Sequence, residues 1–236
     1  MTIEQIDTWR KTHYTKDISA DLAGKEIILG GWVRNFRDLG GLKFINLQDK
    51  YGERQITLKK GNVSDELFEK TKLGYQYCVM VKGVVKAFDK APGGVEIIPS
   101  ELRILNKTPE KLPIDMTGET ISELDIRLNN RSLDLRSLRN QAIFEIRGDV
   151  LNSIRQFLLD NDFSEITTPK IIGSATEGGT ELFPIMYFDK EAFLTQSAQL
   201  YKEQLSDVYE RVYEISPCFR AEKSRTKRHI CEIFVL

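Results

Sequence analysis

A series of short β-rich runs, separated by turn signals, is the feature that most constrains the fold of this chain. Gly-Gly, Asp-Lys-Tyr-Gly and Pro-Gly-Gly sequences separate the runs, and such sequences favour tight turns. The runs cover residues 26–36, 42–49, 54–60, 77–88 and 95–105. Five strands at this spacing predict a small closed barrel.

Residues 63–72, between the third and fourth runs, have a helical composition. A helix at this place is usual in a five-stranded OB-type barrel, and such barrels present one face and its loops to single-stranded nucleic acid. Cations and aromatic rings occur together in and between the first two runs, at Arg34, Phe36, Arg37, Lys43 and Phe44. Phosphate neutralisation and base stacking require this mixture. The alternative is a core phenylalanine at 44 with solvated arginines, and a barrel alone specifies no function.

The remaining segments predict a second domain. We expect a short leading helix over residues 3–11 and a linker over residues 106–126, which hold two of the seven prolines and little periodicity. Apolar residues recur at three- and four-residue steps from Ile143 to Leu158, which predicts a long amphipathic helix with one buried face, ending near Asn161. This helix suits a dimer interface or packing within one domain.

Two features further along indicate a binding site. Glu177 precedes Gly178 and Gly179, which let the backbone approach a ligand closely, so the carboxylate could clamp an ammonium group. Gln199 and Lys202 lie three residues apart on one face of an expected helix and could hold a small anion. A surface loop followed by a solvated helix is the alternative.

The C-terminal part predicts antiparallel strands at residues 210–214 and 218–222, then a polar hairpin and a last strand. Arg220 and Glu222 lie two apart on a strand and would project from one face. An arginine there could bind a phosphate with two hydrogen bonds, while the glutamate accepts from an amino group. Alternatively the two side chains pair with each other, which at a surface contributes about 0–1 kcal/mol.

Composition excludes several classes of function. The net charge of −1 comes from 34 basic and 35 acidic residues, so local patches alone could attract a polyanion. Three separated cysteines without a C-x-x-C pair, and only two histidines, argue against a structural zinc site or a disulfide framework. We expect no metal site within the chain. Because no apolar run approaches the roughly 20 residues that span a bilayer, we expect a soluble cytoplasmic protein without membrane contact.

In this order the pieces resemble a class II aminoacyl-tRNA synthetase of the aspartyl type found in archaea and eukaryotes. The resemblance runs from about residue 18 to the end of the chain. It implies an α+β fold, in which a five-stranded OB-type barrel reads the anticodon and a class II antiparallel-sheet domain makes the aminoacyl-adenylate. The implied boundaries are a barrel at 1–105, a linker at 106–130 and an incomplete catalytic domain at 131–236.

The resemblance assigns the amino-acid site. ATEGGTELFPI is similar to the family's flipping loop, whose glutamate, here Glu177, receives the amino group of aspartate. QSAQLYK matches the family's QSPQLYK except at Ala198, and implies that Gln199 and Lys202 contact the amino acid. The charge of the lysine would help to select an aspartate side chain over neutral ones.

FRAEKSRTKRH is similar to the family's motif 2. It implies that Arg220 holds the ATP α-phosphate and the aspartate carboxylate, and that Glu222 binds the adenine amino group. Arg228 and His229 would contact further phosphates of ATP, His229 the γ-phosphate. The resemblance also implies ATP and L-aspartate as substrates, with Mg²⁺ bridging the phosphates.

The resemblance further assigns the contacts with tRNA and with a second subunit. Arg37, Phe44 and Gln55 match anticodon contacts, with Phe44 stacking on a base and Gln55 hydrogen bonding to one. The partners implied are tRNA(Asp) and, in a relaxed enzyme, tRNA(Asn). The predicted long helix and the strand closing at Pro169 match motif 1, which implies a homodimer.

Two departures from the family bear on the prediction. The acidic residue and aromatic that usually follow the histidine are replaced here by Glu232-Ile233-Phe234. The chain ends at Leu236, before the family's magnesium carboxylates and motif 3 arginine, so we expect a truncated synthetase that is inactive alone. An asparaginyl-tRNA synthetase and a noncatalytic tRNA-binding paralogue remain alternatives. Joint retention of Glu177, Lys202, Arg220 and Glu222 favours descent from a working enzyme.

Overall fold

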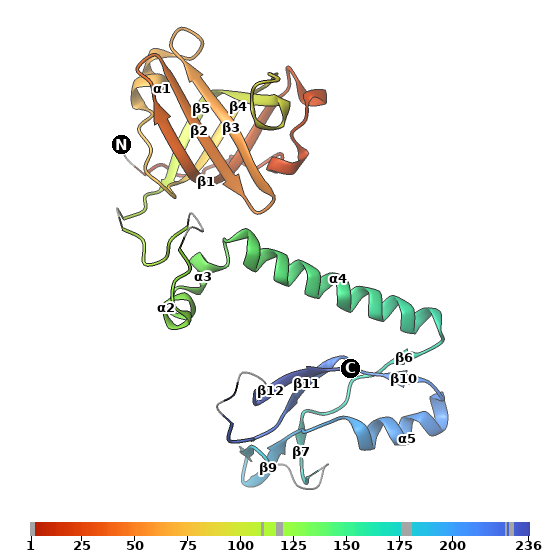
Figure 1. Ribbon diagram of the computed structural model, residues 1–236. Helices are drawn as coiled ribbons and strands as arrows, with labels where there is room; N and C mark the ends of the chain where they lie inside the picture. The colour runs from red at the N-terminus through yellow and green to blue at the C-terminus, as the bar shows by residue number, and fades with distance from the viewer. Residues whose placement is uncertain (1–2, 110, 117–119, 176–180, 225, 227–228) are drawn as a thin grey trace. The chain divides into compact units, whose positions relative to one another are not determined.

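The computed structural model describes residues 3–109, 111–116, 120–175, 181–224, 226 and 229–236. The chain divides into two compact units, Met1–Ile143 and Phe144–Leu236. The first unit holds a closed β-barrel and the second holds short strands and helix α5 (Gln199–Tyr209) (Figure 1). The fold is therefore α+β, as the sequence predicts, whereas the boundaries at 105 and 130 stay a prediction.

Five strands close the barrel in the order β1-β2-β3-β5-β4. They are β1 (Glu26–Asp38), β2 (Leu42–Asp49), β3 (Gly52–Lys59), β4 (Cys78–Ala87) and β5 (Val95–Asn106). Every neighbouring pair is antiparallel except β3 and β5, which are parallel. The 3-10 helix η3 (Pro92–Gly94) lies in the turn between β4 and β5. These strands confirm the five predicted runs.

The barrel core consists of aliphatic side chains that alternate along the strands. In β2, Ile45 and Leu47 are fully buried, while Phe44 and Asn46, which alternate with them, point outward. The inward set includes Ile27, Leu29, Val33, Ile56, Leu58, Val79, Val81, Ile97 and Ile104. Burial of each such side chain stabilises the fold by about 1.5–3 kcal/mol, so the barrel is a self-sufficient core.

Helix α1 (Asp65–Lys70) confirms the helix expected within residues 63–72. Ser64 caps its N-terminus by accepting a hydrogen bond from Leu67 N at 3.2 Å. At the C-terminal end, the buried Lys43 Nζ donates to Phe68 O at 2.6 Å and to Thr71 O at 3.0 Å. Lys43 faces inward, so the expectation that it belongs to a nucleic-acid-binding mixture of cations is wrong.

The predicted helix over residues 3–11 is also wrong. This segment, which we call the strap (residues 3–17), runs extended over the barrel and is helical only in the 3-10 turn η1 (Thr15–Asp17). Glu4 N donates to Ile104 O at 2.8 Å, and Thr12 N donates to Ile28 O at 2.9 Å. A second 3-10 turn, η2 (Ala20–Leu22), leads into β1.

Open strand edges explain this conformation. β2 pairs only with Trp32–Asp38 of β1, so the first half of β1 has an edge that Thr12 covers. β3 pairs with β5 at Ile97 alone, so Ile104 near the end of β5 is available to Glu4. Unpaired backbone groups on such edges need hydrogen-bond partners. The strap provides these partners at Ile28 and at Ile104.

Asp49, at the end of β2, anchors the strap. Its buried carboxylate accepts from Lys11 Nζ at 2.7 Å, Thr15 N at 2.9 Å and Thr15 Oγ1 at 2.5 Å. It also accepts from Tyr51 N at 2.9 Å, which closes the β2–β3 turn. One carboxylate therefore joins the N-terminal segment to a hairpin more than thirty residues away.

In the rest of the first unit, the helices α2 (Leu124–Asn129) and α3 (Arg131–Asp134) are joined by Asp134. This buried carboxylate accepts from Arg127 Nε at 2.8 Å and from Arg131. The hydrogen bond from Arg127 is the main cause that keeps the pKa of Asp134 below its ordinary value. The pair of short helices is therefore held by charge-assisted hydrogen bonds rather than by a hydrophobic core.

The long helix α4 (Leu138–Asp160) confirms the predicted amphipathic helix and its end. Many of its apolar side chains are nevertheless exposed, including Ile143 at 56%, Ile146 at 62% and Phe157 at 66%, and Ile154 and Leu158 are half-buried. Asn140 is the buried residue within its described length. The expectation of one buried face is wrong, because no apolar side chain of α4 is buried among the described residues.

The described part of the second unit contains two two-stranded sheets and one three-stranded sheet. They are β6 (Ser164–Glu165) with β10 (Val212–Tyr213), β7 (Ile171–Ile172) and β8 (Pro184–Tyr187) with β9 (Lys190–Leu194), and β11 (Ser216–Phe219) with β12 (Glu232–Val235). β10 is parallel to β6, so the predicted antiparallel pairing of residues 210–214 with 218–222 is wrong. β11 instead pairs antiparallel with β12 across the hairpin.

We predict that Asp49→Asn lowers the free energy of unfolding and makes it less dependent on pH. Burial raises the pKa of Asp49, but hydrogen bonds from Lys11 and Thr15 outweigh it and hold the pKa below its ordinary value of 3.8. A lowered pKa stabilises the fold above the unfolded-state value, and this stability is lost as the pH falls through the folded-state value. We expect a loss of about 1–3 kcal/mol at pH 7 in urea unfolding, and a smaller one at pH 3.

The exposed Asp89 provides the matched control. Asp89→Asn removes the same charge without a buried partner, so its effect should stay within about 0.5 kcal/mol at both pH values. Equal effects of the two substitutions would contradict the anchoring role of Asp49.

Candidate functional site

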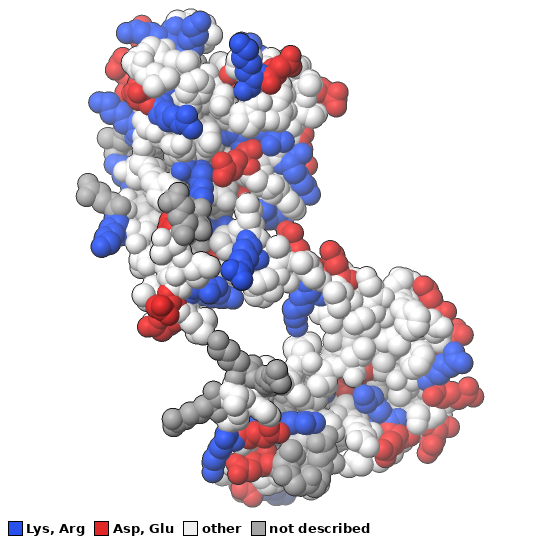
Figure 2. Space-filling view, viewed as in Figure 1, with Lys and Arg blue, Asp and Glu red and all other residues white. Residues whose placement is uncertain are grey.

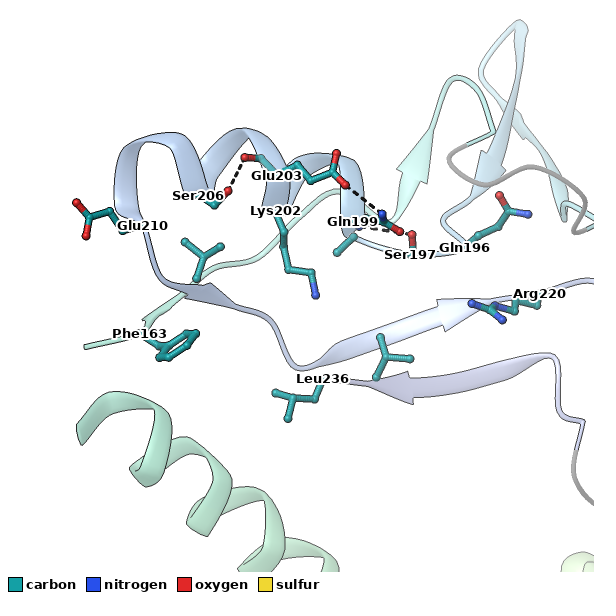
Figure 3. Close-up of a pocket in the computed structure, with 13 residues that line it drawn as sticks. Phe163, Gln196, Ser197, Gln199, Lys202, Glu203, Ser206, Glu210, Arg220 and Leu236 are labelled. Carbon is teal, nitrogen blue, oxygen red and sulfur yellow. Dashed lines mark hydrogen bonds between the residues drawn. The ribbon is translucent and has the colours of Figure 1, made fainter. Parts of the chain in front are cut away.

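A cavity of about 540 Å³ in the second unit brings together three of the predicted site residues, Gln199, Lys202 and Arg220 (Figure 3). Its lining comprises Phe163, Gln196, Ser197, Ala198, Gln199, Lys202, Glu203, Ser206, Glu210, Val212, Arg220, Val235 and Leu236. The polar residues come chiefly from α5 and the turn before it, and Arg220 follows the last residue of β11. The cavity therefore joins segments about twenty residues apart in the chain.

Helix α5 positions Gln199 and Lys202. The helix starts where Lys202 N donates to Ala198 O at 3.0 Å, and the Ser197 hydroxyl accepts from Gln199 N at 3.4 Å. Residues three apart lie on one helix face, so both side chains can reach the same ligand. In Figure 3 the Lys202 side chain extends from α5 toward the strands β11 and β12. An ammonium group in this position favours an anionic ligand.

The amide of Gln199 has a defined orientation. Its Nε2 donates to Glu203 Oε1 at 3.0 Å, across one turn of α5. Because the nitrogen is bound by the carboxylate, the oxygen is the atom turned away from Glu203. An amide oxygen accepts hydrogen bonds, so Gln199 suits an ammonium group on the ligand.

Arg220 lies one residue beyond β11. Arg220 N donates to Cys231 O at 2.9 Å, which extends the β11–β12 ladder by one hydrogen bond. The strand itself ends at Phe219, and Glu222 lies in the loop that follows. The prediction that Arg220 and Glu222 share one face of a strand is therefore wrong, and Glu222 does not line the cavity.

The other predicted residues lie elsewhere or outside the described part of the chain. Glu177 and Arg228 lie outside the described residues. His229 Nδ1 is 2.7 Å from Thr226 Oγ1 in the exposed loop before β12. Pro169 is exposed and follows the buried Thr168. Of the predicted site residues that the structure describes, Gln199, Lys202 and Arg220 therefore lie together at the cavity, whereas Glu222 and His229 lie outside its lining.

A buried ionic network connects Glu214 with the residues on either side of Pro169. Glu214 accepts from Thr168 N at 3.0 Å, Thr168 Oγ1 at 2.8 Å and Lys170 Nζ at 2.7 Å. Burial raises the pKa of Glu214, but its hydrogen bonds to Lys170 and Thr168 outweigh it and lower the pKa below 4.5. Burial raises the pKa of Cys218 nearby, so that thiol stays protonated. This network joins the segment at Thr168 and Lys170 to the residue that follows β10.

The barrel brings the three predicted anticodon residues onto one outer face. Phe44 lies opposite Arg37 on β1 and opposite Thr57 on β3. The next cross-strand row on the same face is Asn35, Asn46 and Gln55. Phe44 is half-buried and lies outside the core cluster, and Gln55 Nε2 donates to Thr57 Oγ1 at 3.3 Å. Arg37, Phe44 and Gln55 can therefore contact one ligand together.

Sequence reasoning missed two residues that shape the cavity. Gln196 is 1% exposed and lines the cavity at the end of β9. Glu203 binds Gln199, and its spacing of four residues on a predicted helix was a signal that could have identified it. Gln196 is the first residue of the QSAQLYK motif, but no local pattern predicts its burial.

The described residues were compared with the requirements of a metal site and of a membrane-spanning helix. They contain no group of three or more His, Cys, Asp or Glu side chains that could hold a metal ion. Among the helices described, none has both the length and the apolar character to cross a bilayer.

We predict that Lys170→Met destabilises the second unit. The substitution leaves the Glu214 carboxylate, 2% exposed, without its cation, and an uncompensated buried charge is costly. We expect the free energy of unfolding to fall by about 1–3 kcal/mol at pH 7, measured by urea denaturation. Lys190→Met, at an exposed position of β9, should have little effect, and Lys170→Arg should restore most of the loss. A stability unchanged in Lys170→Met would show that Glu214 does not depend on this pair.

Two family models match this chain. Residues 27–105 match the family described as OB-fold nucleic acid binding domain, and residues 123–236 match tRNA synthetases class II (D, K and N). The chain is 51% identical over 224 residues to an aspartate–tRNA(Asp/Asn) ligase of Methanopyrus kandleri, covering 94% of this chain and 52% of that protein. A ligase of the same name from Methanocaldococcus jannaschii is 50% identical over 226 residues, covering 95% and 52%.

Solved structures show the same relation. The structure of asparaginyl-tRNA synthetase from Pyrococcus horikoshii complexed with asparaginyl-adenylate has a TM-score of 0.86 at 37% identity, over 95% of this chain and 51% of that chain. An aspartyl-tRNA synthetase from Entamoeba histolytica has a TM-score of 0.74 at 25% identity, over 99% and 52%. The chain therefore spans about half the length of the curated relatives and structures that it matches.

Proposed function

We propose that this chain acts as part of a class II tRNA synthetase of the D, K and N group. Its residues 123–236 match that family, and residues 27–105 match an OB-fold nucleic acid binding domain. The proposed activity is that of an aspartate–tRNA ligase: activation of L-aspartate by ATP, then transfer to tRNA(Asp). The observation that carries the proposal is the convergence of Gln199, Lys202 and Arg220 on one cavity. The ligases of similar sequence support the same activity.

The first step needs positioning more than proton transfer. An oxygen of the aspartate α-carboxylate attacks the α-phosphorus of ATP, and the bond from that phosphorus to the bridging oxygen of pyrophosphate breaks. Pyrophosphate leaves with the electron pair, and no general base is required because the attacking carboxylate is already deprotonated. Arg220 would cancel charge on the α-phosphate and on the carboxylate, and holding both reactants together lowers the barrier.

The amino-acid contacts follow from the side chains of α5. Lys202 would bind the side-chain carboxylate of aspartate, since its ammonium group extends into the cavity. The oxygen of Gln199, held by Glu203, would accept from the α-ammonium group. By the family resemblance Glu177 would receive the same ammonium group.

The remaining ATP contacts are assigned by motif 2. Glu222 would bind the adenine amino group, and Arg228 and His229 would bind the distal phosphates. Mg²⁺ would act by neutralising the phosphates of the bound nucleotide. Because the described residues supply no cluster of carboxylates for it, we assign it no ligand in this chain.

For tRNA, the proposed contact is the outer barrel face with Arg37, Phe44 and Gln55. Both tRNA(Asp) and tRNA(Asn) are candidate substrates, as in the names of the similar ligases. We also propose a homodimer through α4 and the segment ending at Pro169, supported by the exposed apolar side chains of α4. Translation requires this activity in the cytoplasm, and we propose that location.

An asparaginyl-tRNA synthetase is the second candidate. The observation in its favour is the likeness to the Pyrococcus horikoshii asparaginyl enzyme at a TM-score of 0.86. Lys202 argues for aspartate, because an ammonium group gains more from a carboxylate than from an amide.

We predict that Arg220→Ala abolishes aspartate-dependent ATP–pyrophosphate exchange. The assay compares the 236-residue chain with a chimera continued after Leu236 by the C-terminal half of the Methanocaldococcus jannaschii ligase. We expect exchange with aspartate, not asparagine, in the chimera, and a loss of more than about 100-fold on removal of the guanidinium. Lys223→Ala, at an exposed position beyond the cavity, is the control.

Two outcomes distinguish the candidate functions, and a third tests the role of Arg220. Exchange with asparagine would favour the asparaginyl enzyme. No exchange in the chimera would favour a noncatalytic tRNA-binding protein. Exchange near the unmodified level in Arg220→Ala would remove that residue from the site.

We predict that Phe44→Ala weakens tRNA binding by about 1–3 kcal/mol, the contribution of one stacked base. The half-buried ring lies outside the barrel core, so the fold should persist. Binding is measured by fluorescence anisotropy with labelled tRNA(Asp). Unchanged affinity in a folded variant would contradict a stacking role, and Phe88→Ala, at another partly exposed ring, is the matched control.

A further inference from the structure

The strap and the β2–β3 turn form an exposed cluster of lysines and tyrosines. We call it the strap cluster: Lys11, Tyr14, Lys16, Lys50 and Tyr51. The rings of Tyr14 and Tyr51 meet edge to face with centroids 5.1 Å apart. Both rings are partly exposed, at 42% and 37%. Two partly exposed aromatic rings therefore lie beside the ammonium groups of Lys16 and Lys50, whereas Lys11 Nζ already donates to Gly30 O and Asp49.

Positive charge converges on Tyr51. Lys16 Nζ lies 3.8 Å and Lys50 Nζ 4.4 Å from the centroid of this ring. Hydrogen bonds from Lys50 and Lys16 lower the pKa of the Tyr51 hydroxyl below 10, which reflects the same positive surroundings. Like charges held close together repel, and an anion bound between them would relieve the repulsion.

The cluster is held in place by the Asp49 anchor. Asp49 accepts from Lys11, from Thr15 in the strap and from the Tyr51 backbone in the turn. The two halves of the cluster are thereby joined by one buried carboxylate, although they are far apart in sequence. Such anchoring lowers the entropy lost when a ligand binds.

The cluster lies at one end of the outer barrel face. Along β2 the outward residues run from Phe44 through Asn46 to Gln48, and the turn at Lys50 follows. Six residues of strand from Phe44 to Lys50 span about 20 Å. A nucleic acid that covers 4–16 nucleotides of an OB fold is long enough to reach both places.

We propose that the strap cluster binds the sugar–phosphate backbone of RNA next to the nucleotides whose bases lie on the outer barrel face. Lys16 and Lys50 contact phosphates, and Tyr14 offers a face for stacking. The proposal rests on the proposed binding of tRNA by the barrel, and it adds a contact outside the predicted anticodon residues.

The chemistry favours RNA over other anions. Ammonium groups beside exposed aromatic rings are the combination that binds single strands, through phosphate neutralisation and stacking. The cluster lies on an open surface, so a single free phosphate would meet few contacts. Figure 2 shows basic and acidic side chains mixed over the visible face, so local clusters rather than a large basic field must supply this attraction.

The test compares two double variants of the 236-residue chain. Lys16→Gln with Lys50→Gln removes two charges from the cluster, whereas Lys25→Gln with Lys72→Gln removes two from exposed positions before β1 and after α1. Binding of the tRNA(Asp) anticodon stem–loop is measured from 50 to 200 mM salt. Thermal unfolding checks that each variant is folded.

Each phosphate neutralised on a single strand contributes about 0.7 to the slope of log affinity against log salt. Loss of two contacts should therefore reduce the slope by about 1.4, so that the loss of affinity is about sevenfold larger at 50 mM than at 200 mM salt. The control pair should leave the slope unchanged. Inorganic phosphate at 1 mM should not compete with the RNA if the backbone is the ligand.

The outcomes distinguish this inference from the proposed function. If the unmodified chain binds no stem–loop RNA, the proposed tRNA contact fails, and this inference with it. A second outcome is that the chain binds RNA and Phe44→Ala weakens this binding, while both double variants keep the salt dependence of the unmodified chain. That outcome would overturn the proposed role of the strap cluster and leave the proposed tRNA contact standing. Equal loss in both double variants also overturns it, since general attraction then explains the effect. Competition by phosphate would reassign the cluster to a small anion.

Discussion

Closure of a five-stranded barrel with unequal pairing is the constraint on which the rest of the first unit depends. Because β2 covers only half of β1, and β3 meets β5 at a single residue pair, closure leaves backbone groups that another segment must satisfy. The strap satisfies them, and Asp49 fixes the strap to the hairpin. The outer face, with Phe44 and Gln55, is rigid because the opposite faces of the same strands form the core. The binding surface is thus a consequence of how the barrel closes.

The second unit solves a different problem, since its strands are short and its cavity depends on connections between them. Glu214 joins β10 to the segment at Thr168 and Lys170, and Thr195 O accepts from Phe219 N at 2.8 Å, which connects β9 to β11. These polar links bring α5 beside the end of β11. A site that relies on positioning needs such links, because small displacements of Lys202 or Arg220 would separate the charges that act together.

Local sequence patterns predicted most helices and strands. Features that depend on pairing between distant segments were not predicted. The five strands, α1 and α4 follow from alternation, turn residues and helical periodicity, all of which lie within short windows. The strap was wrongly expected to be a helix because its partners, Ile28 and Ile104, are remote in sequence. The pairing of β10 with β6 was missed for the same reason. Gln199 and Lys202 were found from helix spacing, whereas the approach of Arg220 was implied only by family resemblance.

Lysines in this chain show why composition alone says so little about partners. Lys43 is buried and caps α1, Lys170 neutralises a buried carboxylate, and Lys202 extends into an open cavity. An ammonium group that already donates to protein carbonyls or carboxylates is not available to a ligand, since removing it from them would leave buried acceptors unsatisfied. Only a lysine whose surroundings keep it hydrated or beside aromatic rings can exchange water for phosphate. With a net charge of −1, recognition of a polyanion by this chain must therefore depend on where each cation lies.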